Sequence, residues 1–319
     1  MKKAAYIILF ILLVLNFVTC NCYAFWIWTP ESNKWVNPKY SVKETPSEQL
    51  EFSLGFYEEK SYEEAIKEFK KLIKNYPRAR EAPEAQYYIS KCYEDQEKLF
   101  SAFKGYQVVI DKYPFSERSP EIIKKQFDIG IKLLEGSGDK GFLKKTFADD
   151  SYDVVEVFRT VIKNAPYGEY AAPSQYKIGL YLSEKKLYQE SRDEFEKVIN
   201  DYPDSEWAKA SKYQIAMSDA LRSTEAQYDQ KVTEAAVEGL KDFMSDYPGA
   251  DLSEKAKEEI RGLREKEAEN AFLVAEFYEK QKNYKAAKIY YQSIVNDYKG
   301  SIWSSKALER IREVSKKQL

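Results

Sequence analysis

The chain has 319 residues, which is long enough to bury a sizeable core, and its 50 basic and 52 acidic residues leave a net charge of −2. Its 26 Tyr and 17 Phe give far more aromatic surface than a disordered chain carries, so the composition indicates a folded protein. The charges are spread along the chain without a basic stripe, which argues against a nucleic-acid partner.

The amino terminus has the pattern of a signal peptide, expected over residues 1–24. Two lysines precede an apolar run from Ala4 to Leu15, about half of the ~20 residues that cross a bilayer. Two cleavage patterns remain open. Phe17-Val18-Thr19-Cys20 resembles a bacterial lipobox, which would place an acyl anchor on Cys20, whereas Cys22-Tyr23-Ala24 suits ordinary signal peptidase. Both predict export.

An aromatic-rich segment follows over residues 25–44. Trp26, Trp28 and Trp35 are three of the chain's five tryptophans. The alternation of Trp26 and Trp28 before Thr29-Pro30 predicts a short extended ribbon, with a hairpin whose return strand is 34–36. Three roles remain open for this segment: a cap on the first repeat, a contact with a membrane interface, or stacking on a glycan or a partner.

A sequence motif that ends in Tyr-Pro then recurs along residues 45–319. Apolar positions are followed by Asp or Asn and then by the terminator, and the spacing is close to a 34-residue tetratricopeptide unit with insertions. Two of the copies are degenerate. The six copies end at Pro77, Pro114, Pro166, Pro203, Pro248 and Lys299.

Each copy also keeps a register of small and large residues. Twelve residues before the end stand Ala65, Ala102, Val154, Ser191, Ala236 and Ala287, of which five are small. Eight residues before the end stand Phe69, Tyr106, Phe158, Phe195, Leu240 and Tyr291, all large. Two closely crossing helices need a side without bulk and a ring opposite, and Pro stops the second helix because it lacks an N–H.

This register predicts an all-α fold, a right-handed α-solenoid of about six tetratricopeptide-like helix pairs with a capping helix at the carboxy terminus. Stacked pairs share a continuous core, because each pair alone leaves an apolar face bare. An insertion at 135–150 separates the helices of the third pair. The expected pairs are 47–59/62–75, 81–95/99–112, 117–134/151–164, 169–184/188–201, 205–223/231–246 and 253–280/284–297, with the cap at 301–316.

Two of these repeats resemble a known family, the BamD-like (YfiO-type) outer membrane assembly lipoproteins. The first repeat carries the likeness in Leu54-Gly55-Phe56-Tyr57, Tyr62 to Ile66, Phe69 and Tyr76-Pro77, and the last repeat in Arg261, Leu263, Ala268, Val274 to Tyr278, Tyr284 and Ala286-Ala287. The resemblance implies a scaffold on the periplasmic side of the outer membrane, held there through a lipid anchor. Its expected partners are unfolded outer-membrane proteins and components that insert β-barrels. The family has five repeats, whereas we count six.

The inner surface of the repeats is the candidate binding site. In a tetratricopeptide solenoid the first helix of each pair lines the concave surface, which predicts a peptide groove that alternates rings, aliphatic groups and charges. A terminal carboxylate of a bound peptide would pair with Lys91. The alternative, that some of these side chains pack between repeats, remains open. The candidates are Leu50, Leu54, Tyr57, Tyr87, Lys91, Glu94, Tyr176 and Leu180.

The sequence offers little for catalysis, and we expect no enzyme, cofactor or metal site. Histidine is absent, and Cys92 is the single cysteine of the repeat region, expected to be buried and inert. Gly136 to Gly141 matches a dinucleotide-binding glycine pattern, but a helix instead of a strand is expected before it. Two other functions stay open: a soluble periplasmic adaptor of cell division or cell-wall maintenance, and a peptidoglycan-active or carbohydrate-binding protein that uses the tryptophans.

Overall fold

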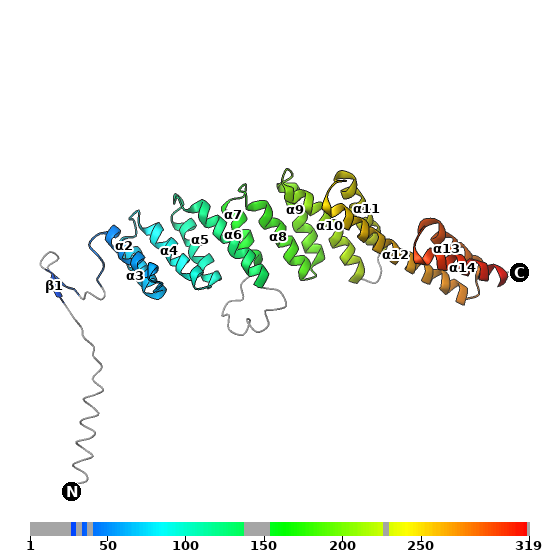
Figure 1. Cartoon of the computed structure of the whole chain (residues 1–319), viewed down its shortest axis with the longest axis horizontal. Coiled ribbons are helices and arrows are strands. Elements are labelled where there is room, and N and C mark those ends of the chain that lie inside the picture. The colour runs from blue at the N-terminus through cyan, green and yellow to red at the C-terminus, as the bar shows by residue number, and fades with distance from the viewer. Residues whose placement is uncertain (1–26, 30–33, 37–40, 137–153, 226–229, 318–319) are drawn as a thin grey trace, which may run out of the picture. The chain divides into compact units, whose positions relative to one another are not determined.

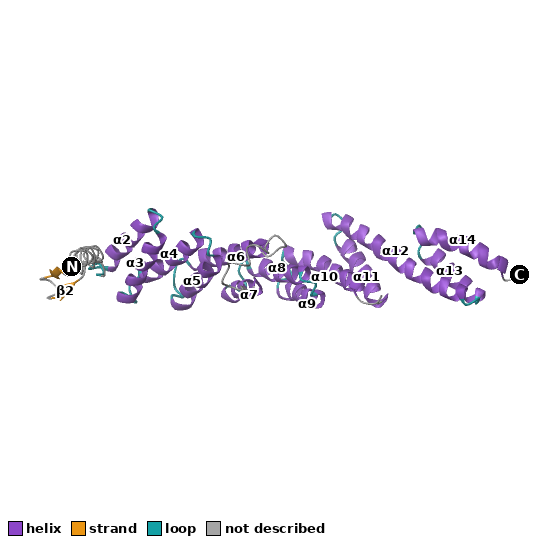
Figure 2. Cartoon of the chain, turned by 90° about the horizontal axis from the view of Figure 1, so that it is seen from below, coloured by secondary structure: helices purple, strands orange, loops and turns teal. Residues whose placement is uncertain are grey.

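A computed structural model describes residues 27–29, 34–36, 41–136, 154–225 and 230–317. The described chain is helical apart from two short strands (Figures 1 and 2). It forms two compact units, Met1–Glu97 and Lys98–Leu319. The predicted signal peptide, Cys20, Trp26 and nearly all of the insertion expected at 135–150 lie outside the described residues.

The first unit contains a hairpin and three helices. Strands β1 (Ile27–Thr29) and β2 (Lys34–Val36) pair antiparallel, with Trp28 opposite Trp35, which confirms the predicted hairpin. Helix α2 begins where Thr45 accepts a hydrogen bond from the Glu48 N–H at 3.2 Å and Pro46 takes the first helical position. The helices are α2 (Pro46–Glu58), α3 (Tyr62–Asn75) and α4 (Ala82–Asp95).

The second unit continues the same helical pattern. Its helices are α5 (Leu99–Lys112), α6 (Ser119–Gly136), α7 (Val154–Asn164), α8 (Ala171–Glu184), α9 (Tyr188–Asp201), α10 (Glu206–Glu225), α11 (Gln230–Asp246), α12 (Asp251–Lys280), α13 (Tyr284–Asp297) and α14 (Ile302–Lys317). Helices that follow one another in the chain pack against one another within each unit. The predicted helix pairs and the last helix are confirmed, with every end within three residues of its expected position.

The register of small and large residues accounts for the core. All twelve residues at these two positions are buried, including Val154, the one larger residue at the small position. Close packing is tightest where glycine faces a ring: a Cβ added at Gly179 would lie 2.6 Å from the ring of Phe195, and one at Gly130 would lie 2.8 Å from that of Phe158. These glycines let the two helices of a pair approach.

The turns inside the helix pairs share a backbone feature that the sequence reasoning missed. Lys60, Glu97, Lys186 and Lys282 all have positive φ values, between 58° and 64°, and each stands directly before the N-cap residue of the second helix. Glycine is the usual residue in this left-handed conformation. Because these four positions carry Lys or Glu instead of glycine, the sequence contains no local indication of the left-handed conformation.

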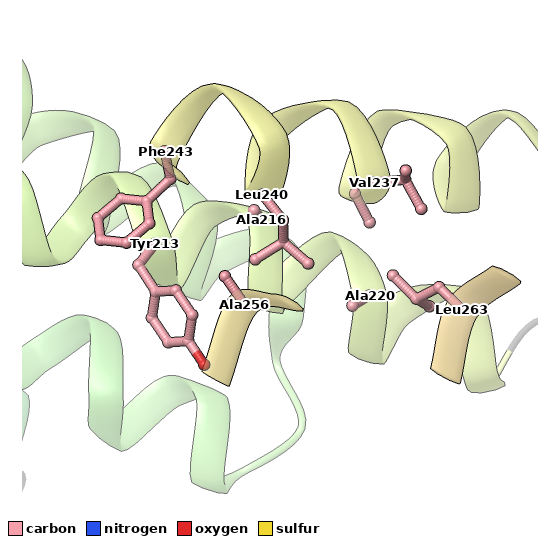
Figure 3. Packing of buried hydrophobic residues seen from close by; sticks show 9 residues of the cluster. Tyr213, Ala216, Ala220, Val237, Leu240, Phe243, Ala256 and Leu263 are labelled. Carbon is pink, nitrogen blue, oxygen red and sulfur yellow. The ribbon is translucent and has the colours of Figure 1, made fainter. Parts of the chain in front are cut away.

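Helix α12 takes part in two separate cores. Its first half contributes Ala256 and Leu263 to a cluster with α10 and α11, in which Leu240 and Phe243 also lie (Figure 3). Its second half contributes Ala268, Phe272 and Ala275 to another cluster with α13 and α14. The 30 residues of this helix therefore join two helix layers that share no buried cluster.

Candidate interaction surfaces

Tyr57 and Lys91, two of the groove candidates, lie close together in the first unit. The Tyr57 hydroxyl donates a hydrogen bond to Asp95 Oδ2 at 2.6 Å, so α2 is tied to α4. The Lys91 ammonium lies over the rings of Tyr57 and Tyr88, at 5.4 and 5.7 Å from their centroids. Burial and the hydrogen bond to Asp95 both raise the pKa of Tyr57, so it stays a neutral donor. The sequence reasoning missed Tyr88 and Asp95.

The other groove candidates behave differently from one another. Tyr87 is 2% exposed and Tyr176 is 8% exposed, so these two rings offer a partner almost no surface, a correction to the expected groove. Tyr176 instead packs on Phe195 and Trp207 and accepts a hydrogen bond from Gln214 at 3.2 Å. The Tyr176 ring fills the space where helices α8, α9 and α10 meet. Leu50, Leu54, Glu94 and Leu180 are partly exposed, and Leu180 borders the Tyr176 cluster.

A second surface in the first unit lies on α2 and was not predicted. Phe52 and Phe56 form an edge-to-face pair with ring centroids 5.1 Å apart, and the Lys43 ammonium lies 4.3 Å above the Phe52 ring. These side chains, with Glu48, Glu51, Gly55 and Glu59, line an open depression. The four-residue spacing of Phe52 and Phe56 was the available sequence signal.

The hairpin presents its two described tryptophans to solvent. Trp28 and Trp35 are direct cross-strand partners, so they stand on the same face of the ribbon. They are 45% and 66% exposed. Large exposed rings side by side suit stacking on a flat ligand or seating at an interface, and the structure leaves these roles untested.

Buried carboxylates in the second unit act as structural ties. Glu279 of α12 accepts hydrogen bonds from Tyr291 of α13 at 3.1 Å and from Lys317 of α14 at 3.2 Å, and it lies 2.8 Å from Arg310. Burial by itself raises the pKa of Glu279, but the hydrogen bonds from Lys317, Tyr291 and Arg310 outweigh it, so the pKa falls below its ordinary value. This carboxylate therefore fastens the last helix to the pair before it.

The remaining chemical candidates have structural roles or lie outside the described part. Cys92 is buried, as predicted, and burial together with the Asp95 carboxylate raises its thiol pKa to about 12, which keeps it protonated. Of the glycine-rich pattern only Gly136 is described, as the last residue of α6, so the helix expected before the pattern is confirmed. Within the described ranges no three His, Cys, Asp or Glu side chains gather as metal ligands. In the same ranges no helix has the length and apolar character to span a membrane.

Comparison with known proteins identifies the repeats in two parts. Residues 53–79 and 84–116 match the model for the tetratricopeptide repeat. Residues 166–318 match the YfiO family model, described as outer membrane lipoprotein. The specific likeness therefore begins at the fourth repeat, and the first repeat matches only the general motif. No curated protein matches the chain.

Solved structures with similar helices are tetratricopeptide proteins at low identity. One from Parabacteroides merdae is 14% identical with a TM-score of 0.35, over 86% of this chain and all of that one. One from Cytophaga hutchinsonii is 16% identical with a TM-score of 0.37, over 83% of this chain and 87% of that one. One from Thermus thermophilus is 14% identical with a TM-score of 0.32, over 68% of this chain and 99% of that one.

The predicted resemblance is thus confirmed over the carboxy-terminal repeats, where the helices, their register and the family model agree. This is a tetratricopeptide-repeat protein whose residues 166–318 match the BamD-like, YfiO-type outer membrane lipoprotein family.

Proposed function

We propose that the chain is a non-catalytic scaffold of the cell envelope, which binds unfolded outer-membrane proteins, a β-barrel insertion partner, or both. The observation that carries this proposal is the family match over residues 166–318 on a chain of tetratricopeptide repeats. Such repeats form long surfaces of stacked helices without a catalytic arrangement of side chains, and these surfaces usually bind other protein chains.

The amino-terminal unit supports client binding through Tyr57, Tyr88 and Lys91. The centroids of the Tyr57 and Tyr88 rings lie 5.2 Å apart, and the Lys91 ammonium lies over both rings. Two rings beside a cation suit the last residues of an extended peptide. The rings would cover an aromatic or aliphatic side chain, and Lys91 would pair with the terminal carboxylate.

The amino terminus supports a place on the periplasmic side of the outer membrane. Export follows from the apolar run of the leader, and acylation of Cys20 would hold the scaffold on a leaflet. Cleavage after Ala24 would instead release a soluble periplasmic protein. Intact mass spectrometry of the mature chain separates the two: an acylated Cys20 supports the anchored scaffold, and an unmodified start at Phe25 supports the soluble adaptor.

Client binding is tested with the mature full-length chain and a urea-unfolded β-barrel protein diluted into buffer. We expect saturable binding by fluorescence anisotropy, and Lys91→Ala should weaken it at least about fivefold, roughly 1 kcal/mol. Lys67→Ala is the matched control, because Lys67 is an exposed lysine of the same unit that lies 3.6 Å from Glu64. Absence of binding, or equal loss in both variants, contradicts the proposal.

A further inference from the structure

The last helix pair carries an apolar surface that the other elements leave open. It consists of Leu273, Val274, Phe277 and Tyr278 on α12 with Ile289 and Tyr290 on α13, and we name it the α12–α13 face. Tyr278 and Tyr290 stack with their centroids 5.1 Å apart and their planes 8° from parallel, which joins the two helices across the face. All six except the partly buried Tyr278 are exposed. Contiguous apolar surface of this kind marks an interaction site in a folded protein.

The equivalent positions of the pair α8–α9 show what this face is turned toward. Helices α9 and α13 have the same length and register, so each position of α13 has its counterpart 96 residues earlier. Glu194, the counterpart of Tyr290, is buried, and Arg159 of α7 in the preceding pair lies 3.2 Å from its carboxylate. A side chain of the second helix of the preceding pair therefore reaches this position in α8–α9.

Helix α12 is too long for its second half to be covered in the same way. Helix α11 shares a core with Ala256 and Leu263 in the first half of α12. Beyond them, Phe272 and Ala275 share a core with α13 and α14. In the described part of the chain, no helix other than α13 and α14 shares a buried cluster with the second half of α12.

The residue choice at Ile289 is specific to this repeat. The other five repeats carry a charged residue ten positions before their terminator: Lys67, Lys104, Glu156, Asp193 and Glu238. An isoleucine at 63% exposure in this register gains nothing from the fold itself. Its burial by another chain would remove that apolar area from water.

We propose that the α12–α13 face binds one amphipathic helix of a partner protein, with acidic residues at the end that lies beside the α12–α13 turn. The occupant is a helix because the apolar residues of α12 recur four apart, as Leu273/Phe277 and Val274/Tyr278, which is the spacing of a ridge that packs against a second helix. Its acidic end follows from the turn, where Lys282, Lys285 and Lys288 stand without an acidic residue between them, next to Lys280, which lies 3.9 Å from Glu276. About 14 residues, near 21 Å, would match the length of α13. The inference rests on the proposed function only in that the chain holds protein partners.

The test uses the mature full-length chain and fluorescent synthetic helices of about 18 residues. One helix carries a leucine stripe at helical spacing and three glutamates at one end, a second has lysines in place of these glutamates, and a third has the first composition scrambled. We expect the acid-flanked helix to bind saturably and the other two at least about tenfold more weakly. Ile289→Glu and Phe277→Glu should each weaken binding at least about tenfold. Ile302→Glu is the matched control, since Ile302 is 66% exposed and lies on α14 outside the face, and it should stay within twofold.

Each other result counts against the proposal. No saturable binding, or equal weakening by Ile289→Glu and Ile302→Glu, overturns it. So does a dimer of the wild-type chain that Ile289→Glu dissociates in sedimentation, because a second copy would then cover the face. Binding to anionic vesicles that Ile289→Glu abolishes, without peptide binding, points to lipid and overturns it too. If the helical peptide does not bind but the client protein does, the proposed function stands and the binding role of the α12–α13 face is overturned. If the peptide binds but the client protein does not, the binding role of the face stands and the proposed function is overturned.

Discussion

The pairs α8–α9 and α12–α13 have similar aromatic interiors and different outer surfaces. In the first pair the ring centroids of Tyr176 and Trp207 lie 5.1 Å apart. In the second pair the ring centroids of Phe272 and Trp303, which occupy the corresponding helices, also lie 5.1 Å apart. Their outer positions diverge. Glu194 is bonded by Gln175 and lies near Arg159 and Lys197, whereas its counterpart Tyr290 stacks on Tyr278 in the open.

This difference separates two requirements that a repeat must meet. The interior is set by the two helices of the pair and by the helix that follows, so it recurs with the register. The outer positions depend on what lies beside them: Arg159 of α7 reaches Glu194 in the one pair, and Tyr290 is exposed in the other. A repeat protein can therefore change its binding surface without changing its core.

The largest expected effect tests the interior of α8–α9, where Gly179 takes the place that Ala275 has in α12–α13. Gly179→Ala places a Cβ against the buried Phe195 ring, and we expect the free energy of unfolding to fall by about 3 kcal/mol, because the fully buried ring or its helix must shift to make room. Urea denaturation followed by circular dichroism measures the change. Gly262→Ala is the control: that exposed helical glycine has open space around it, so the change should stabilise by about 0.5–1 kcal/mol. A neutral Gly179→Ala would show that the pair is not closely packed.

The next effect sharpens the contrast at the carboxy-terminal end of α12–α13. Glu279→Gln removes the charge that Arg310 and Lys317 share, and we expect a loss of about 2 kcal/mol at neutral pH. Since the folded-state pKa of Glu279 is lowered, its contribution is present above the unfolded pKa of about 4.3 and disappears as the pH falls through the folded value. Denaturation curves of wild type and variant should therefore differ at pH 7 and approach each other as the pH is lowered below the unfolded pKa of Glu279.

Glu267 on the same helix provides the opposite case. Burial raises its pKa despite the nearby Arg264, so its charged form is disfavoured in the folded state. Glu267→Gln should thus leave stability at pH 7 unchanged or slightly increased. A loss equal to that of Glu279→Gln would contradict the assigned difference.

A smaller effect concerns the turns that both pairs share. Lys186 has φ +64°, a conformation that a β-branched residue strongly disfavours. We expect Lys186→Val to cost about 1–2 kcal/mol by thermal denaturation and Lys186→Gly to cost less than about 0.5 kcal/mol. Equal effects of the two substitutions would mean that the backbone conformation is not what matters there.

The smallest expected change is on the open face. Ile289→Glu should alter the free energy of unfolding by no more than about 0.5 kcal/mol, because the side chain is exposed and its counterpart Asp193 is also charged and exposed. The same substitution should lower the binding of a hydrophobic fluorescent dye. Ile294→Glu is the contrasting variant, since Ile294 is fully buried and its replacement should unfold this end of the protein. A large loss of stability in Ile289→Glu would place this residue in the core.

The sequence by itself determined the helices, because their signals are local. Terminators, small residues and rings recur at fixed distances, and these distances located helix ends within three residues, placed all twelve register residues in the core and anticipated the Trp28–Trp35 hairpin. The tertiary structure decided which remaining side chains meet another element. It buried Tyr87 and Tyr176, tied Tyr57 to Asp95, and divided α12 between two cores, so that Ile289 and Tyr290 lie uncovered. No local pattern contains that outcome, since burial at these remaining positions depends on where the neighbouring helices stand.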